Sequence, residues 1–217
     1  MPKSNKNLRS QPINLPPEAA DLNAVSRVTA RAIHKQHSAV EAGRRILEMT
    51  GEDGDREGLR DTPYRFAKAY QALLDGYNLT PDEAVGKGIF ASEGQGLVAV
   101  EDVEFYSMCE HHLLPFWGKA TVAYFPGEKI LGLSKIPRLV DVFARRVQVQ
   151  ERITQQVLDA VQDLIAPRAV MVKVQAQHLC MMMRGVEKQQ SQTTTQSIYG
   201  YEKLQDYEKQ QLLRLMK

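Results

Sequence analysis

Two short clusters of histidine and cysteine constrain the fold of this chain more than any other feature of its sequence. The first is Cys109-Glu110-His111-His112, which follows an alternating apolar run over residues 98–105, and the second is His178-Leu179-Cys180. In the Cys-x-x-His spacing, a thiolate and an imidazole of one tight turn can aim at a single point, and zinc prefers this pair of ligands. The clusters contain both cysteines and three of the five histidines. If they cooperate, the fold must bring together two segments that are distant in the sequence.

The composition indicates one globular domain with appendages and argues against several classes of function. The chain has 217 residues, of which 43% are hydrophobic and 25% are charged, enough for a sizeable core. A net charge of +2, with no basic block longer than an arginine pair, gives no reason to expect nucleic acid as a partner. Residues 1–10 lack the apolar stretch of a signal peptide, and no segment reaches membrane-spanning length. Two cysteines make no disulfide framework, so we expect a reducing, cytoplasmic compartment in which thiolates stay available to metal.

The chain divides into four segments by pattern. Residues 1–37 are a polar arm interrupted by prolines and holding the start of a helix, and residues 38–95 are a helical part. One helix is predicted for residues 24–49 and a second from Asp61-Thr62-Pro63 to Gly76, because a capping side chain followed by proline suits a helix start. Residues 96–200 form the core domain. Residues 201–217 are a charged tail with four leucines, which permits a short helix.

The core domain reads as an α+β structure. Alternating or threonine-rich runs predict strands at residues 98–105, 120–125, 170–176 and 191–199. Residues 134–147 begin with Ser134 as a capping residue, and residues 153–165 carry a wide apolar stripe, so both are predicted as amphipathic helices. Two consecutive amphipathic helices must cover one face of the sheet.

The number of metal ligands decides what such a site could do. Side chains two apart on a strand share a face, so we expect His178 and Cys180 to face Cys109 and His112 if their strands are neighbours. A structural zinc site would use four protein ligands, whereas a catalytic site uses three and leaves a position for water. A set of Cys109, His112 and Cys180 leaves His111 and His178 free for acid-base chemistry. The alternative is that the cysteines are buried apolar residues and the histidines are inert.

Two further stretches offer charged groups for a ligand. Residues 132–138 place Ser134, Lys135 and Arg138 at a helix start, where free N–H groups and the helix dipole favour an anion. The same stretch also fits a capped helix with solvated basic residues. Glu151 lies at the break between two predicted helices, where its carboxylate could either cap a helix or accept two hydrogen bonds from a ligand. Arg184 adds a cation just beyond Cys180.

Several of these motifs, taken in order and spacing, resemble the GTP cyclohydrolase I family. They are the two clusters above and the stretches Asp61-Thr62-Pro63-Tyr64-Arg65, Gly118–Tyr124, Gly132-Leu133-Ser134-Lys135, Gln148–Arg152 and Arg184-Gly185-Val186. The match covers about residues 38–200, and the tail after Gly200 falls outside it. The resemblance implies the tunnelling fold, a four-stranded antiparallel sheet backed by two helices, with a helical N-terminal part. It also implies a decamer with active sites between subunits.

The resemblance further implies an activity and a role for each matching residue. Zinc, held by Cys109, His112 and Cys180, activates water to attack C8 of GTP, with His111 and His178 as the acid-base pair. Glu151, helped by Gln150, holds guanine. The ribose triphosphate is held by Ser134, Lys135, Arg138 and Arg184, with Arg65 and Lys68 reaching in from a neighbouring subunit. Formate leaves, and the product is 7,8-dihydroneopterin triphosphate, at the first step of tetrahydrofolate and pterin biosynthesis; no redox cofactor is needed.

Two alternatives to this activity stay open at the level of sequence. One is a zinc-stabilised binding protein with the same fold and a dead site, which would show a fourth protein ligand or lack the acid-base histidines. The other is an enzyme of the same fold that processes a different purine or pterin. Retention of His111, His178 and Glu151 argues against the first alternative. A guanine-holding Glu151 is common to enzymes of the second kind, but zinc with both histidines argues for ring hydrolysis.

Overall fold

The structure is a computed structural model that describes residues 27–216, with side chains described from residue 36 onward. The described residues form two compact units, one ending at Ala69 and the other starting at Tyr70. The arm predicted over residues 1–37 lies mostly outside the described residues, and the division expected at residue 95 stays a prediction. No helix in the described part of the chain has both the length and the apolar character needed to cross a membrane.

The first unit contains the two helices predicted for it. Helix α1 spans Arg27–Thr50 and ends before Gly51, which has the positive φ of 76° that favours glycine after a helix. Helix α2 spans Thr62–Leu73 and crosses the boundary between the units. The two helices pack closely where Gly43 meets Phe66, because a Cβ atom at Gly43 would lie 3.0 Å from that ring.

The second unit is built on a sheet of five strands. In spatial order they are β5 (Val147–Gln148), β2 (Val98–Cys109), β3 (Pro115–Phe125), β6 (Ala169–His178) and β7 (Thr193–Tyr199). The four long strands are antiparallel to one another, as predicted, and each of them begins or ends within a few residues of its expected bounds. The sequence did not predict β5, a two-residue strand that pairs with β2 in parallel.

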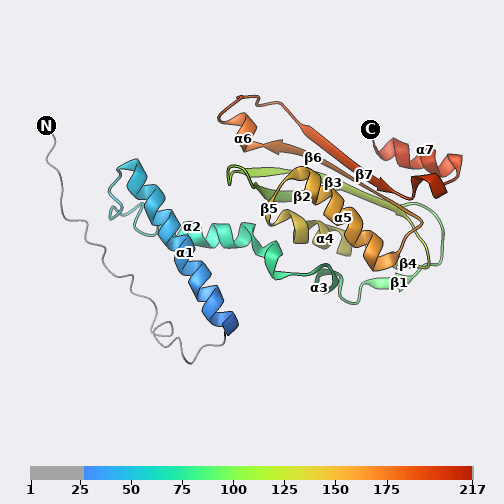
Figure 1. Cartoon of the computed structure of the whole chain (residues 1–217), viewed down its shortest axis with the longest axis horizontal. Helices are drawn as coiled ribbons and strands as arrows, with labels where there is room; N and C mark the ends of the chain where they lie inside the picture. Colours follow the sequence, from blue (N-terminus) through green and yellow to red (C-terminus); the bar gives the residue numbers. More distant parts are fainter. Residues whose placement is uncertain (1–26, 217) are drawn as a thin grey trace. The chain divides into compact units, whose positions relative to one another are not determined.

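Helices α4 (Lys135–Ala144) and α5 (Gln150–Ile165) cover one face of this sheet (Figure 1). Alternate residues of β6, including Val170, Val172 and Val174, point into the core between the sheet and the helices and are fully buried. This layer was predicted from the two amphipathic patterns and is confirmed. The prediction that Ser134 caps α4 is wrong in detail, because its backbone is already helical and its side chain makes no capping hydrogen bond.

Several short elements lie outside the main sheet and the two helices that cover it. The stretch between α2 and the sheet holds a 3-10 turn (Asp75–Asn78), helix α3 (Pro81–Val85) and strand β1 (Ile89–Ala91), which pairs with β4 (Lys129–Leu131). Helix α2 ends at Leu73, three residues before Gly76, where the sequence predicted its end. Helix α6 (Leu179–Met182) and a 3-10 turn (Tyr201–Lys203) precede the last helix, α7 (Asp206–Leu215).

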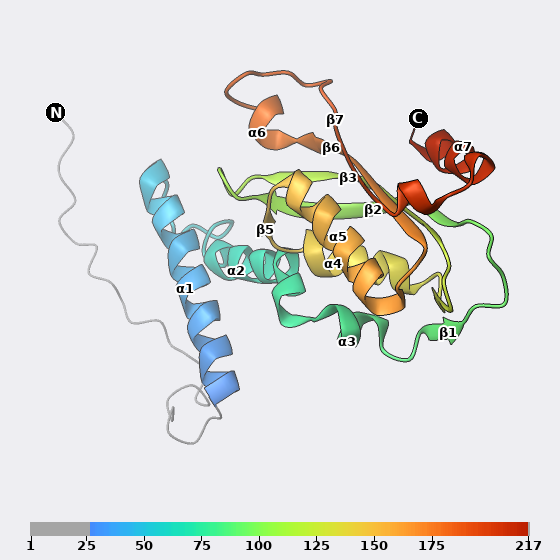
Figure 2. The same ribbon diagram turned by 45° about the vertical axis from the view of Figure 1, so that its right-hand side comes forward.

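The C-terminal tail is part of the fold and packs on the face of the sheet that α4 and α5 leave open. Leu204 and Leu212 are buried in a second apolar cluster with residues of β3 and β6, including Phe125 and Met171. Figure 2 shows α7 (dark red) apart from α4 and α5, beside the end of β7. The short helix that the sequence permitted therefore forms, and its leucines complete a core.

An ion pair fixes this tail to the sheet. Arg168 donates to the Glu208 carboxylate over 2.6 Å, and the Glu208 side chain is only 3% exposed. Arg168 also donates to the backbone oxygens of Gln95 and Pro126, so one guanidinium joins three segments. The hydrogen bond from Arg168, together with one from the backbone N–H of Gln205, lowers the pKa of Glu208.

We expect Glu208→Gln to loosen the tail, because the amide keeps the shape but loses the charged hydrogen bonds. The local free energy of opening should fall by about 2 kcal/mol. Amide hydrogen exchange of residues 204–215 at neutral pH should then become roughly thirtyfold faster. Since the pKa of Glu208 is lowered in the fold, its stabilising effect is present above the ordinary carboxyl value of 4.5 and is lost as the pH falls through the folded pKa.

The difference between Glu208→Gln and the unmodified chain should therefore shrink in acid. Glu202→Gln is the matched control, because Glu202 is an exposed glutamate in the same tail. Equal exchange in the Glu208→Gln and Glu202→Gln variants at neutral pH would show that the ion pair does not hold α7.

Candidate functional site

The first histidine–cysteine cluster forms the tight turn between β2 and β3. Cys109 ends β2, and its N–H donates to the oxygen of Leu114 over 2.9 Å, while the N–H of Leu113 donates back to the Cys109 oxygen over 2.8 Å. Leu113 takes a positive φ of 52°, which lets the chain reverse within four residues. The turn thereby directs the side chains of Cys109 and His112 to the same side.

The second cluster reaches the same place from β6. His178 ends β6 and pairs with Phe116 of β3, near the start of the strand that leaves the turn. Cys180 does not continue the strand but lies in the short helix α6. The expectation that His178 and Cys180 share one face of a strand is therefore wrong, although the predicted convergence of the two clusters occurs.

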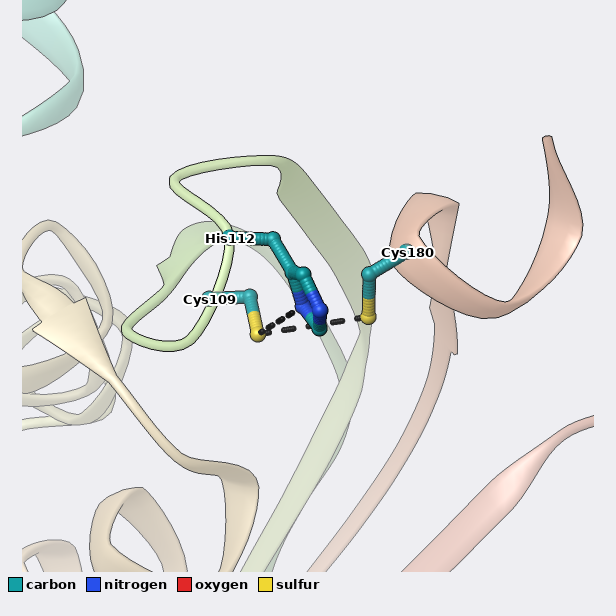
Figure 3. Close-up of side chains that lie close together, drawn as sticks. All are labelled: Cys109, His112 and Cys180. Carbon is teal, nitrogen blue, oxygen red and sulfur yellow. Dashed lines mark hydrogen bonds between the residues drawn. The ribbon is translucent and has the colours of Figure 1, made fainter. Parts of the chain in front are cut away.

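Cys109, His112 and Cys180 form a group that could hold a metal ion, with ligand atoms within 4.8 Å of one another (Figure 3). The Cys109 Sγ atom lies 3.9 Å from Cys180 Sγ and 3.9 Å from His112 Nδ1. Ligands of a tetrahedral zinc ion with Zn–S bonds of about 2.3 Å are themselves roughly 3.8 Å apart. The spacing therefore fits a zinc-sized ion, and it is far too long for a disulfide, whose sulfurs are about 2.05 Å apart.

The electrostatic surroundings of the two sulfurs favour a cation between them. Burial raises the pKa of the Cys180 thiol, and the neighbouring Cys109 raises it further. Two thiolates at this distance repel each other, and a bound cation would remove the repulsion. Among the described residues, no other histidine, cysteine or carboxylate joins these three as a fourth ligand, so three protein ligands are available.

His178 lies beside this group in a fixed orientation. Its ring stacks on Phe116 with centroids 4.4 Å apart and planes only 5° apart, and its Nε2 atom lies 2.9 Å from the Gln150 side-chain oxygen. Burial lowers the pKa of His178, and the negative charge of Glu151 opposes that shift. His178 is therefore held close to Glu151 at the start of α5. His111, by contrast, is exposed, with its Nδ1 atom 3.9 Å from Cys109 Sγ.

Glu151 is an exposed residue in the first turn of α5. Val149 is the capping residue of that helix, and there is no side-chain capping hydrogen bond. The alternative that Glu151 serves as a helix cap is therefore not supported, and its carboxylate is exposed. Gln150 is different, because its side chain is buried and its amide is bonded inside the protein.

A second link joins the turn at Cys109 to the start of α5. Arg152 donates to the Glu110 carboxylate over 2.6 Å, which lowers the pKa of Glu110. The Glu110 N–H donates to the oxygen of Gln148, whose strand β5 pairs directly with Cys109. Arg184 places a cation beside this group, with its Nη1 atom 3.4 Å from His112 Nε2.

Three of the remaining predicted anion-binding residues lie away from this group in the same chain. Ser134, Lys135 and Arg138 lie at the start of α4, whereas the residues after its far end form β5, which pairs with Cys109. The ten-residue helix is about 15 Å long, so it separates the two sets. Arg65 and Lys68 belong to α2 in the first unit, where Arg65 bonds to the Gly58 oxygen and the Thr62 hydroxyl.

Sequence reasoning missed some residues that shape the site. Phe116 stacks under His178, but nothing in the sequence distinguishes it from an ordinary apolar strand residue. The pairing of Glu110 with Arg152 was also missed, because two charged residues 42 positions apart give no signal until β5 brings their segments together.

Comparisons with known proteins show which family this chain resembles. The model of the GTP cyclohydrolase I family matches residues 39–217. The chain is 58% identical over 157 residues to GTP cyclohydrolase 1 of Deinococcus radiodurans, covering 72% of this chain and 73% of that protein. It is 52% identical over 172 residues to GTP cyclohydrolase 1 of Leptospira biflexa, covering 79% and 94%.

A solved structure of the archaeosine synthase QueF-Like in the apo form is a more distant likeness. It has a TM-score of 0.42 and 18% identity, and covers 50% of this chain and 97% of that one. The family match includes the tail, so the expectation that the resemblance ends near Gly200 is wrong. On the extent of the family match and the identity to these relatives, the chain belongs to the GTP cyclohydrolase I family.

Proposed function

We propose that this protein converts GTP to 7,8-dihydroneopterin triphosphate with release of formate, the reaction that opens tetrahydrofolate and pterin biosynthesis. The observation that carries the proposal is a three-ligand metal group with His178 and Glu151 beside it. Family membership supplies the substrate, since its members are named for acting on GTP. The four long antiparallel strands with two helices on one face support assignment to the tunnelling fold.

The metal of this site is zinc in our proposal. Two thiolates and one imidazole form a donor set that suits zinc, and the 3.9 Å spacings fit its bond lengths. Three ligands leave one position open, as catalytic zinc sites do. When bound, zinc supplies Lewis-acid activation of a water molecule for hydrolysis of the imidazole ring of guanine.

The residues around the metal group have separate roles in proton transfer, guanine binding and phosphate binding. His178, held by Phe116 and Gln150, and the exposed His111 transfer protons to and from the opening ring. The Glu151 carboxylate accepts hydrogen bonds from N1–H and the 2-amino group of guanine, two adjacent donors that a carboxylate can bind together. Arg184 lies close enough to the metal group to bind phosphate or ribose oxygens of the same ligand. Hydrolysis, rearrangement and ring closure need no net oxidation, so no redox cofactor is required.

The phosphate-binding set supports a site built from more than one chain. Ser134, Lys135 and Arg138 lie a helix length away from their own metal group, so they are badly placed to hold the triphosphate of a GTP bound there. We propose that they act on a neighbouring chain's substrate, with Arg65 and Lys68 contributed by a further contact. A homodecamer with sites between subunits meets this requirement.

The function is tested by incubating the protein with GTP while following formate and the absorbance of a pterin. We expect both products in equal amounts, and Glu151→Gln should lower kcat/KM by roughly a hundredfold or more, because the amide points a donor at a ligand donor in a desolvated contact. ATP, with an acceptor at N1 and no 2-amino group, should be a very poor substrate of the unmodified protein.

Asp159→Asn is the matched control for Glu151→Gln, because Asp159 is a carboxylate on the same helix that bonds only to Gln155 among the described residues. Its kcat/KM should stay near that of the unmodified protein. Near-normal kcat/KM in Glu151→Gln, or opening of ATP as fast as GTP, would refute the guanine-reading role. Formate without a pterin would indicate a partial reaction, and neither product would point to a binding protein.

Zinc content gives a second test. Elemental analysis should find one zinc ion per chain, and Cys109→Ser or Cys180→Ser should remove it and abolish turnover while circular dichroism stays close to that of the unmodified protein. Met182→Leu, in the same short helix as Cys180, should keep the zinc. If mild chelation unfolded the whole protein, the ion would be structural instead, because structural zinc carries folding free energy.

Assembly is tested by light scattering and by mixing inactive subunits. The unmodified protein should scatter as a large symmetric oligomer. A Cys180→Ser chain lacks the metal group and a Lys135→Ala chain lacks a phosphate contact, but co-expressed together they should recover part of the activity, because some mixed sites take the intact half from each chain. Full activity of a monomer, or no recovery in mixed oligomers, would rule out the shared site.

A further inference from the structure

Gln150 has a buried side chain, and both the nitrogen and the oxygen of its amide form hydrogen bonds within the protein. Its side-chain nitrogen donates to the backbone oxygens of Val174 and Thr193, each over 3.0 Å, and lies 3.3 Å from the Thr195 hydroxyl. Its side-chain oxygen lies 2.9 Å from His178 Nε2. The amide therefore connects α5, β6 and β7 to the ring of one histidine, which leaves it poorly placed to touch a guanine base.

The surroundings fix which end of this amide faces His178. Backbone oxygens can only accept hydrogen bonds, so the atom that faces both Val174 and Thr193 has to be the NH₂ group. Turning the amide over would place its oxygen against two carbonyl oxygens, which repel it, and would lose both hydrogen bonds in a buried place. The atom next to His178 is therefore the carbonyl oxygen, which also can only accept.

An acceptor at that position fixes the proton on the ring. His178 Nε2 must donate to the Gln150 oxygen, so in the neutral imidazole the proton is on Nε2 and the lone pair is on Nδ1. The ring cannot rotate away, because Phe116 stacks flat against it at 4.4 Å. Turning the imidazole over would set a carbon against the amide oxygen and lose the hydrogen bond.

We propose that Gln150 is a positioning residue for catalysis, which holds His178 as the Nε2–H tautomer and thereby presents Nδ1 as the atom that takes up and returns a proton. This inference rests on the proposed function, in which His178 transfers protons during ring opening. It changes the part that Gln150 plays, from help in holding guanine to orientation of the acid-base group. Within the described residues, no hydrogen bond occupies His178 Nδ1, so that nitrogen remains available to substrate or water.

The tautomer can be measured directly. Full-length, zinc-loaded protein with ¹⁵N in its histidine rings would be sedimented and studied by magic-angle-spinning NMR. With five histidines in the chain, His178 is assigned by the signals that vanish in His178→Gln. The unmodified protein should show His178 protonated at Nε2 and bare at Nδ1. Protonation at Nδ1 with a bare Nε2 would overturn the proposal without reference to activity.

Substitutions of Gln150 separate positioning from mere stability. Gln150→Leu removes the acceptor, so the Nδ1–H tautomer should become populated and kcat for GTP should fall about tenfold or more, whereas KM and zinc content stay nearly unchanged. Gln150→Met also removes the acceptor while keeping a side chain of similar length, so it should shift the tautomer and lower kcat in the same way. Should the leucine variant fail to fold, the methionine variant and the tautomer of the unmodified protein still decide the question.

Gln156→Leu is the control, since Gln156 is a glutamine of the same helix that accepts from Gln148 and, in the described part of the chain, has no hydrogen bond with His178. It should change neither the tautomer nor kcat. An unchanged tautomer and an unchanged kcat in Gln150→Leu would refute the proposal. If the unmodified protein does not convert GTP at all, the proposed function fails, while the tautomer measurement still tells whether Gln150 fixes the ring.

Discussion

The pairing of β3 with both of its neighbours is the constraint on which the site depends. β3 is antiparallel to β2 on one side and to β6 on the other, so β2 and β6 run in the same direction. Their C-terminal ends therefore lie at the same end of the sheet. The register of these pairs sets Cys109 just before the turn and His178 opposite Phe116. A shift of one residue in either pair would turn the side chains to the other face and separate the ligands. The metal group is therefore a product of strand register.

The two faces of the sheet are covered by different elements. The face under α4 and α5 is closed by apolar side chains and ends in the polar contacts of Gln150 at the site. The opposite face is closed at one end by α7, and Lys173, which is 7% exposed, donates to the Leu215 oxygen at the end of that helix. A cation there is favoured by the negative end of the helix dipole. The tail thus completes the fold away from the site chemistry.

Much of this organisation could be predicted from the sequence, because it follows from periodicity. The alternation in β2, β3 and β6 and the stripes of α4 and α5 have strong local signals, and the histidine–cysteine spacing indicated the ligand set. Strand β5 could not be predicted, since a two-residue strand has no pattern and forms only because its neighbours hold it. Cys180 was placed on a strand because the sequence pattern gave no sign that β6 stops at His178 and that a short helix follows. The roles of Gln150 and Phe116 depend on contacts across the sheet, which no local pattern records.

The connection between the Cys109 turn and the start of α5 consists largely of main-chain hydrogen bonds. Strand β5 pairs with β2, and the Glu110 N–H bonds to the oxygen of Gln148, so neither contact depends on side-chain identity. If Glu151 reads the base as proposed, a lineage could therefore exchange the residue at position 151 and adopt a different base while its metal group remained in place. Such a scaffold allows ligand preference to diverge during evolution without a simultaneous loss of hydrolytic chemistry.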